Sequence, residues 1–208
     1  MRTLSTLPTK FIAVLGLLCV PILAQNFSTY TTTIQLGPHL KLGYKIQDGK
    51  VFFLVEKMAA GYVAFGLGAS MVEADIVVIE KGADPTKLTI KDCKLKGRFT
   101  PICSEASEDW KWAAADSYTS TATMLKAEIM RPIAASSAAG DEDRSFMNGK
   151  NPIVYAYTTS NTLMVHDETG GYGISNIDLT IATTNANGKF ASRLLTGVLV
   201  FSCLSLWI

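Results

Sequence analysis

The chain has 208 residues, 48% of them hydrophobic, with 19 Lys and Arg against 18 Asp and Glu, a formal net charge of +1. This length suits one domain with a substantial core, and the balanced charge excludes the broad basic surface of a nucleic-acid-binding protein. Because the chain has two histidines, a three-histidine zinc site and a pair of copper centres are excluded as well.

The N-terminal residues 1–24 have the pattern of a secretory signal peptide. Arg2 and Lys10 form a basic start, an uncharged apolar run follows, and Ala24 supplies the small residue at a cleavage point. An uncleaved membrane helix is the alternative, but the run is short for a span and contains the helix-breaking Pro21. We therefore expect cleavage after Ala24 and entry into the secretory pathway.

Two features downstream fit an oxidising compartment outside the cytoplasm. Asn26-Phe27-Ser28 is an N-glycosylation sequon with Asn26 as the acceptor. Cys93 and Cys103 are the two cysteines between the hydrophobic ends, and a close pair in such a compartment is expected to form one disulfide. A metal site built from two cysteines, with no histidine near them, is the disfavoured alternative.

Most of the remaining chain has apolar residues at every second position. From residue 40 to residue 46 apolar and polar side chains alternate, and the Asp48-Gly49 dipeptide that follows favours a hairpin turn. No segment shows a sustained helical period, so the pattern predicts an all-β fold, an antiparallel immunoglobulin-like β-sandwich. The expected strands are residues 40–46, 51–55, 61–68, 74–80, 87–91, 110–119, 121–130, 153–157 and 174–181.

A polar stretch from residue 136 to residue 151 interrupts this alternation. It contains the acidic residues Asp141, Glu142 and Asp143. Three neighbouring acidic residues can bind Ca²⁺, but these lack the spaced ligand pattern of a dedicated calcium loop. The stretch is therefore predicted to be a solvated loop between two strands.

The C-terminal residues 185–208 have the pattern of a GPI-anchor signal. Small residues beginning at Asn185 are followed by a short polar spacer and by an uncharged apolar tail from residue 194. A tail anchor and a final buried strand are the alternatives, and the signal peptide at the other end favours the GPI anchor. We expect attachment at Asn185 and a mature domain of residues 25–184, with 15 basic against 18 acidic residues and a net charge of about −3.

The sequence lacks the motifs of common enzyme chemistry. It contains no Gly-x-Ser-x-Gly nucleophile elbow, no glycine-rich phosphate-binding loop and no dinucleotide-binding fingerprint. A Ser-His-Asp triad would have to use His166 without such an elbow. We therefore expect an electron-transfer or binding domain rather than an enzyme.

Three segments resemble, in order and spacing, the motifs of DOMON domains, and the resemblance extends from about residue 40 to residue 179. The first reads Gly-Tyr-Val-Ala-Phe-Gly, continues through a loop with Met71, and ends in Ala-Asp-Ile-Val-Val. The last is a loop that contains His166. The segments are residues 61–78, residues 131–157 with Arg131-Pro132 and the acidic loop, and residues 165–171.

The resemblance implies a β-sandwich that holds haem b, with Met71 and His166 as the axial iron ligands. A thioether and an imidazole both bind low-spin iron, and an iron with both axial positions filled transfers electrons and does not activate O₂. Taken singly, Met71 could fill a gap in the core and His166 could be a polar turn residue. Aromatic residues could line the haem pocket or serve as ordinary core; the candidates are Tyr62, Phe65, Tyr155, Tyr157 and Tyr172.

Two functions follow from these patterns. The first is one-electron transfer by a haem b domain at the outer face of the plasma membrane, held there by a GPI anchor or, alternatively, secreted. Its redox partner would be a transmembrane b-type cytochrome or ascorbate. The second is a non-haem DOMON module that binds a carbohydrate or a protein at the cell surface.

Overall fold

The computed structural model describes residues 26–59, 61–82, 84, 86–97, 101–103, 109–115, 117–135, 143–159 and 171–181. The expected signal peptide 1–24, the tail 185–208 with Asn185, and His166 lie outside the described residues. The helical structure of the described part is one 3-10 turn, η1 (Phe27–Thr29), and this part contains no helix long and apolar enough to cross a bilayer.

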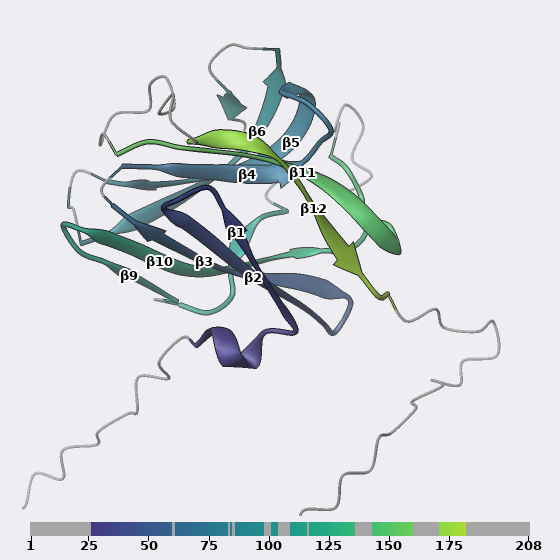
Figure 1. The fold of residues 1–208 in the computed structure, drawn as a ribbon, viewed down its shortest axis with the longest axis horizontal. Coiled ribbons are helices and arrows are strands. Elements are labelled where there is room, and N and C mark those ends of the chain that lie inside the picture. The colour runs from purple at the N-terminus through teal and green to yellow at the C-terminus, as the bar shows by residue number, and fades with distance from the viewer. Residues whose placement is uncertain are drawn as a thin grey trace, which may run out of the picture.

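Two antiparallel sheets pack face to face as a β-sandwich, which confirms the predicted fold class (Figure 1). Sheet A has the order β1-β2-β3-β10-β8, with β9 also paired to β10, and sheet B has the order β12-β11-β4-β5-β6-β7. The strands of sheet A are β1 (Thr32–Leu36), β2 (Leu40–Gln47), β3 (Lys50–Met58), β8 (Lys111–Trp112), β9 (Tyr118–Ser120) and β10 (Met124–Pro132). The strands of sheet B are β4 (Val63–Leu67), β5 (Val72–Lys81), β6 (Leu88–Lys96), β7 (Ile102–Cys103), β11 (Gly149–Tyr157) and β12 (Tyr172–Leu179).

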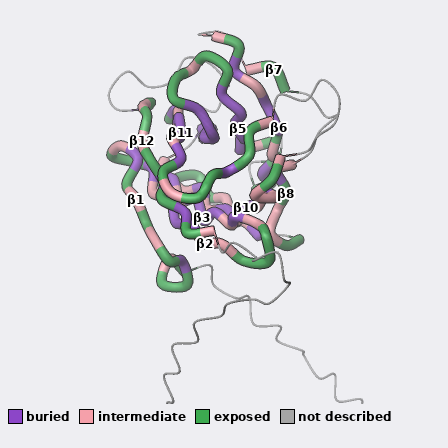
Figure 2. The backbone as a smooth tube through the Cα atoms, turned by 90° about the vertical axis from the view of Figure 1, so that its right-hand side faces the viewer, coloured by how far each residue is buried: buried purple, intermediate pink, exposed green. Residues whose placement is uncertain are grey.

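The core lies between the two sheets and consists of alternate residues of each strand (Figure 2). On β10, Leu125 and Ile129 are fully buried. Phe53 of sheet A and Phe65 of sheet B lie edge to face with ring centroids 5.4 Å apart, and Trp110 packs against both. These aromatic contacts join the two sheets at the centre of the molecule.

The β2–β3 hairpin forms where Asp48-Gly49 predicted it. Both turn residues have positive φ, 50° for Asp48 and 70° for Gly49, as a two-residue hairpin turn of type I′ requires. The register then pairs Gln47 with Lys50 and continues along the whole of both strands.

The predicted strand 110–119 is wrong in its extent, because the chain forms two short strands, β8 and β9, that both pair with β10. Between them the chain passes around Glu128. The Ala113 amide and the Ser117 hydroxyl both donate to the Glu128 carbonyl, at 3.0 and 2.8 Å. These bonds depend on a strand that follows later in the chain, so local alternation does not reveal them. The edge strands β1 and β7 were not predicted either.

The outer face of sheet A is charged and is partly covered by the N-terminal turn. Lys126 and Glu56 form an ion pair there, with 3.1 Å between nitrogen and oxygen. The Lys41 ammonium lies 4.2 Å from the centre of the Phe27 ring. A Cβ at Gly43 would lie 2.9 Å from the same ring, so the glycine makes room for the turn. A charged outer face is the normal arrangement for an antiparallel sheet.

The expected disulfide between Cys93 and Cys103 is present and joins β6 to the edge strand β7. The two cysteines are direct register partners and are separated by 10 positions in sequence. By the chain-entropy estimate, closing a loop of this length stabilises the fold by about 2–3 kcal/mol.

Gly66 and Gly68 allow β4 to approach β5 closely. A Cβ at Gly66 would lie 2.0 Å from the Asp75 carbonyl oxygen, which belongs to a strand backbone that cannot move aside. Gly66→Ala is therefore expected to lower the free energy of unfolding by about 1–3 kcal/mol, measured by urea unfolding. Gly82→Ala is the control, because its nearest neighbour would lie at 3.8 Å. Equal stability of the two variants would contradict the steric role of Gly66.

Candidate functional site

The outer face of sheet B is apolar and buried over β4, β5, part of β6 and part of β11, whereas the outward side of an antiparallel sheet is commonly polar. On β4, Val63 and Phe65 point into the core, so Tyr62 and Ala64 point outward. We call the buried outward-facing residues the outer cluster. Its members are 0–7% exposed and comprise Tyr62, Ala64, Ala74, Ile76, Val78, Cys93, Leu95 and Val154.

A contiguous apolar surface of this kind is rarely in contact with water in a folded protein, and its members are accordingly buried. Every described strand belongs to one of the two sheets, and none of them forms a third layer over the outer cluster (Figure 1). Ala64 and Ala74 contribute small side chains to this face. The outer cluster is therefore suited to a flat apolar partner, supplied either by the chain itself or by a ligand.

Met71 lies at the margin of this surface. It follows the β4–β5 turn, is half-buried, and packs against the outer cluster. Within the turn the Val72 amide donates to the Ser70 hydroxyl at 3.1 Å. Directly after it, Glu73 has a φ of 59° and the register of β5 shifts between Val72 and Ala74. This bulge twists the start of β5, and such bulges commonly redirect side chains next to binding sites.

His166 lies outside the described residues, but the residues on both sides of its segment are placed. The Tyr157 amide donates to the Gly171 carbonyl at 2.6 Å, and the Thr158 amide donates to the Tyr62 carbonyl at 3.3 Å. Thr158, shortly before the segment that carries His166, therefore lies beside Tyr62 of the outer cluster, whereas Gly171, just after the segment, lies beside Tyr157 on the other side of β11.

The five aromatic candidates do not form one wall. Phe65, Tyr155 and Tyr157 point into the core between the sheets. Tyr62 and Tyr172 face the other side, Tyr62 buried in the outer cluster and Tyr172 48% exposed. The reason is the two-residue period of a strand, which sends neighbouring side chains to opposite faces.

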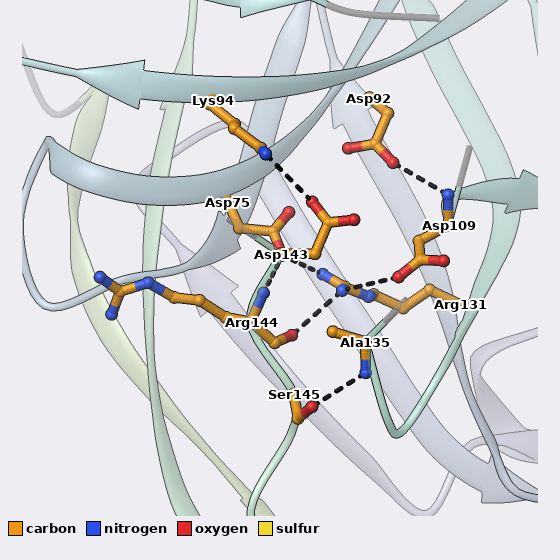
Figure 3. Close-up of polar contacts among 9 residues, drawn as sticks. All are labelled: Asp75, Asp92, Lys94, Asp109, Arg131, Ala135, Asp143, Arg144 and Ser145. Atoms are coloured by element: carbon orange, nitrogen blue, oxygen red, sulfur yellow. Dashed lines mark hydrogen bonds and ion pairs between the residues drawn. The ribbon is translucent and has the colours of Figure 1, made fainter. Parts of the chain in front are cut away.

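A buried charged cluster between the sheets was not predicted (Figure 3). The Arg131 side chain is 0% exposed, and its Nη1 donates to Asp75 Oδ2 at 2.8 Å. Its Nη2 donates to Asp109 Oδ2 at 3.4 Å and to the Arg144 carbonyl at 3.0 Å. The guanidinium carbon lies 5.0 Å from the centre of the Trp110 ring. Away from water, such charges are tolerated because each faces an opposite charge or a hydrogen-bonding partner.

The sequence does contain a signal for this cluster. Asp75 is the single charge in the apolar run Ala-Asp-Ile-Val-Val, and a charged residue in a buried strand requires a partner. Arg131 lies 56 positions later on the opposite sheet, where it continues the inward alternation of β10. The existence of a partner was therefore predictable, whereas its identity depends on how the sheets pack.

Asp92 belongs to the same interior region. Burial raises the pKa of its carboxyl to about 6, and the negative charge of Asp75 adds to this rise. The Asp109 amide, which donates to Asp92 Oδ2 at 3.0 Å, lowers the pKa, as does the Trp110 amide, but neither outweighs burial.

Asp92→Asn is expected to stabilise the protein increasingly as the pH rises. An unperturbed carboxyl has a pKa near 3.8, so in the wild type the folded state binds the proton more tightly than the unfolded state. The stabilisation that results is complete below about pH 4 and is lost as the pH rises to about 6. The advantage of Asp92→Asn should therefore grow over this range and reach up to about 3 kcal/mol at neutral pH. Urea unfolding in metal-free buffer measures it, and a pH-independent difference would contradict the raised pKa.

Comparison with known proteins supports the fold. No family model matches the chain, and no relative was found among curated proteins. The cytochrome domain of cellobiose dehydrogenase from Myriococcum thermophilum is similar in structure, with a TM-score of 0.53 and 12% identity over 68% of this chain and 75% of that one. The cytochrome b domain of pyranose dehydrogenase from Coprinopsis cinerea has a TM-score of 0.51 and 13% identity over 67% and 76%. The chain therefore has a β-sandwich fold similar to that of these cytochrome domains.

Proposed function

We propose that this chain is a DOMON-type domain that binds haem b and transfers single electrons. One observation carries the proposal: a buried apolar cluster lies on the outer face of sheet B, and Met71 packs against it. The fold shared with two cytochrome domains and the DOMON-like sequence motifs support it. The haem would supply a reversible one-electron couple, and the chain would supply its binding surface and its iron ligands.

The residues of the outer cluster suit a porphyrin in polarity. Ile76, Val78 and Leu95 offer apolar contacts, and Ala64 contributes a small side chain to the same face. The Lys91–Glu80 ion pair lies beside Val78 on the same face, at the border of the apolar cluster. Such an apolar cluster excludes water, and solvent exclusion is one of the levers that set the reduction potential of a haem.

Met71 and His166 are the proposed axial ligands. Met71 offers a thioether at the margin of the outer cluster, and Thr158, shortly before the segment with His166, lies beside Tyr62 of the same cluster. Two strong-field ligands favour low-spin iron and leave no position for O₂. Of the aromatic candidates, Tyr62 and Tyr172 stay in the proposal as neighbours of the haem, because both face this side of sheet B.

The sequence patterns at the two ends extend the proposal to a cellular setting. The mature domain would comprise residues 25–184, carry a glycan on Asn26, and be attached through Asn185 to a GPI anchor at the outer face of the plasma membrane. Asn26 is exposed, as an acceptor must be. With no catalytic site of its own, the domain would exchange electrons with a transmembrane b-type cytochrome or with ascorbate.

The visible spectrum of the protein, expressed as the full chain in a eukaryotic secretory host and then purified, tests the proposal. We expect a Soret band that shifts on reduction with dithionite and the sharp bands of low-spin haem b. His166→Ala should convert this spectrum to a high-spin one. A folded protein that stays colourless after incubation with haem would overturn the proposal and favour the alternative, a non-haem DOMON module that binds a carbohydrate or a protein.

A further inference from the structure

Three carboxylates from three separate elements converge between the sheets. They belong to Asp75 on β5, Asp92 on β6, and Asp143 in the segment before β11 (Figure 3). Each offers one oxygen atom, and the three oxygens lie within 4.8 Å of one another. An ion that holds oxygen ligands at 2.3–2.6 Å has opposite ligands about 4.6–5.2 Å apart, so these separations fit within one coordination sphere.

The carboxylates are buried, and one of them has an oxygen without a hydrogen-bond donor. The side chains of Asp75 and Asp143 are each 1% exposed, which corrects the prediction that Asp143 lies in a solvated loop. Asp75 Oδ2 accepts from Arg131 and from the Arg144 amide, at 2.8 and 2.7 Å. Asp75 Oδ1 receives no hydrogen bond from the described residues and is turned toward the Asp143 carboxylate. A buried carboxylate oxygen in this position needs a positive partner.

Among the described residues, two cations lie next to these carboxylates. Arg131 faces Asp75 and Asp109, and Lys94 lies 3.9 Å from Asp143 Oδ1. Neither donates a hydrogen bond to Asp75 Oδ1. A bound cation would supply the positive partner that this oxygen lacks among the described residues.

We propose that Asp75, Asp92 and Asp143 bind a divalent cation, and that this cation is Ca²⁺. The site offers oxygen ligands alone, which suit a hard cation and not zinc, copper or iron. Ca²⁺ accepts six to eight oxygens in variable geometry, whereas Mg²⁺ requires a near-ideal octahedron. Ligands from two strands and a connecting segment form an irregular set, and Ca²⁺ tolerates such a set better.

The cation site is separate from the proposed haem site. Asp75 and Asp92 point into the sandwich, whereas Ile76 and Cys93, their neighbours on the same strands, point into the outer cluster. The two sites therefore lie on opposite faces of β5 and β6, and each can be tested without the other. A bound cation would also fasten the segment of Asp143 to sheet B.

Terbium luminescence and thermal unfolding test the proposal on the full chain expressed in a eukaryotic secretory host. Tb³⁺ occupies calcium sites and emits when a nearby tryptophan is excited, and the Trp110 amide donates to Asp92. We expect saturable Tb³⁺ emission that Ca²⁺ displaces and Mg²⁺ does not. We also expect a rise in melting temperature of about 3–6 °C at a Ca²⁺ concentration tenfold above its dissociation constant.

Two variants test the ligands, and a third is their control. Asp143→Asn and Asp92→Asn should each abolish the Ca²⁺-dependent rise and yet be more stable than the wild type in EDTA, because each removes one negative charge from the group of buried carboxylates. Asp178→Asn, an exposed residue on β12, is the matched control and should keep the full rise. A wild-type protein that shows neither Tb³⁺ emission nor a Ca²⁺-dependent rise would overturn the proposal, as would a full rise in Asp143→Asn and Asp92→Asn.

Discussion

Replacement of Arg131 with methionine is expected to lower the free energy of unfolding by about 3–5 kcal/mol, because it leaves buried carboxylates without their cation. Arg131 is the cation that faces both Asp75 and Asp109. Methionine would keep apolar contact with Trp110 and Phe146, whose ring centres lie 5.0 and 5.4 Å from the guanidinium carbon. The fall in the free energy of unfolding would therefore come mainly from the lost charge and hydrogen bonds of Arg131. Thermal unfolding should show a fall of about 10 °C or more.

Two further variants sharpen this measurement. Arg144→Gln is the control, because its ion pair with Glu73 is exposed and has 3.8 Å between nitrogen and oxygen; we expect a change below about 0.5 kcal/mol. The double variant Asp75→Asn with Arg131→Met should recover part of the lost stability, since it also removes a stranded charge. If Arg131→Met is as stable as the wild type, the buried ion pair has no net role in stability.

Replacement of Met71 with leucine is expected to open one axial position of the iron in the proposed haem site. Leucine is close to methionine in volume and polarity, so the fold should be retained, but it cannot ligate iron. The low-spin spectrum should be lost, and carbon monoxide should shift the spectrum of the reduced variant but not that of the reduced wild type. Replacing a residue that only supports a metal ligand typically lowers the metal affinity about 10–100-fold. Loss of a direct ligand should therefore weaken haem binding at least about tenfold.

Met147→Leu is the matched control for this experiment. Met147 is 61% exposed and lies outside the outer cluster, so its replacement should leave the spectrum and the haem affinity unchanged. A low-spin spectrum in Met71→Leu that matches the wild type would show that another side chain ligates the iron. Haem binding itself would then stand, and the ligand assignment would fail.

Strands β5 and β6 connect the two proposed sites. Their outward residues, among them Ile76 and Leu95, form the apolar surface proposed for haem. Their inward residues Asp75 and Asp92 carry the buried charges proposed to bind a cation. A strand that is buried on both faces usually carries apolar residues on both. The acidic residues on the inner face of these strands therefore break the usual pattern at one specific place.

The strand positions were largely predictable because their signals are local. Alternation located β2, β3 and β10, and the Asp48-Gly49 pair located the first hairpin, since a type I′ turn needs residues that tolerate positive φ. The limits of β8 and β9 were missed because hydrogen bonds to the later residue Glu128 set them. The aromatic wall failed because the residues were chosen by type, without regard to the face of the strand that each occupies.

By itself the sequence determined the all-β class, the hairpin, the disulfide between Cys93 and Cys103, and the candidacy of Met71, because each depends on residue types and spacings along a short stretch of chain. Only the tertiary structure decided which side of sheet B carries the apolar cluster proposed for haem and which charges meet in the interior. Asp75 and Arg131 are 56 positions apart, and Asp75 and Arg144 are 69 apart. Contacts of this kind arise from the packing of one sheet on the other, which no local pattern specifies.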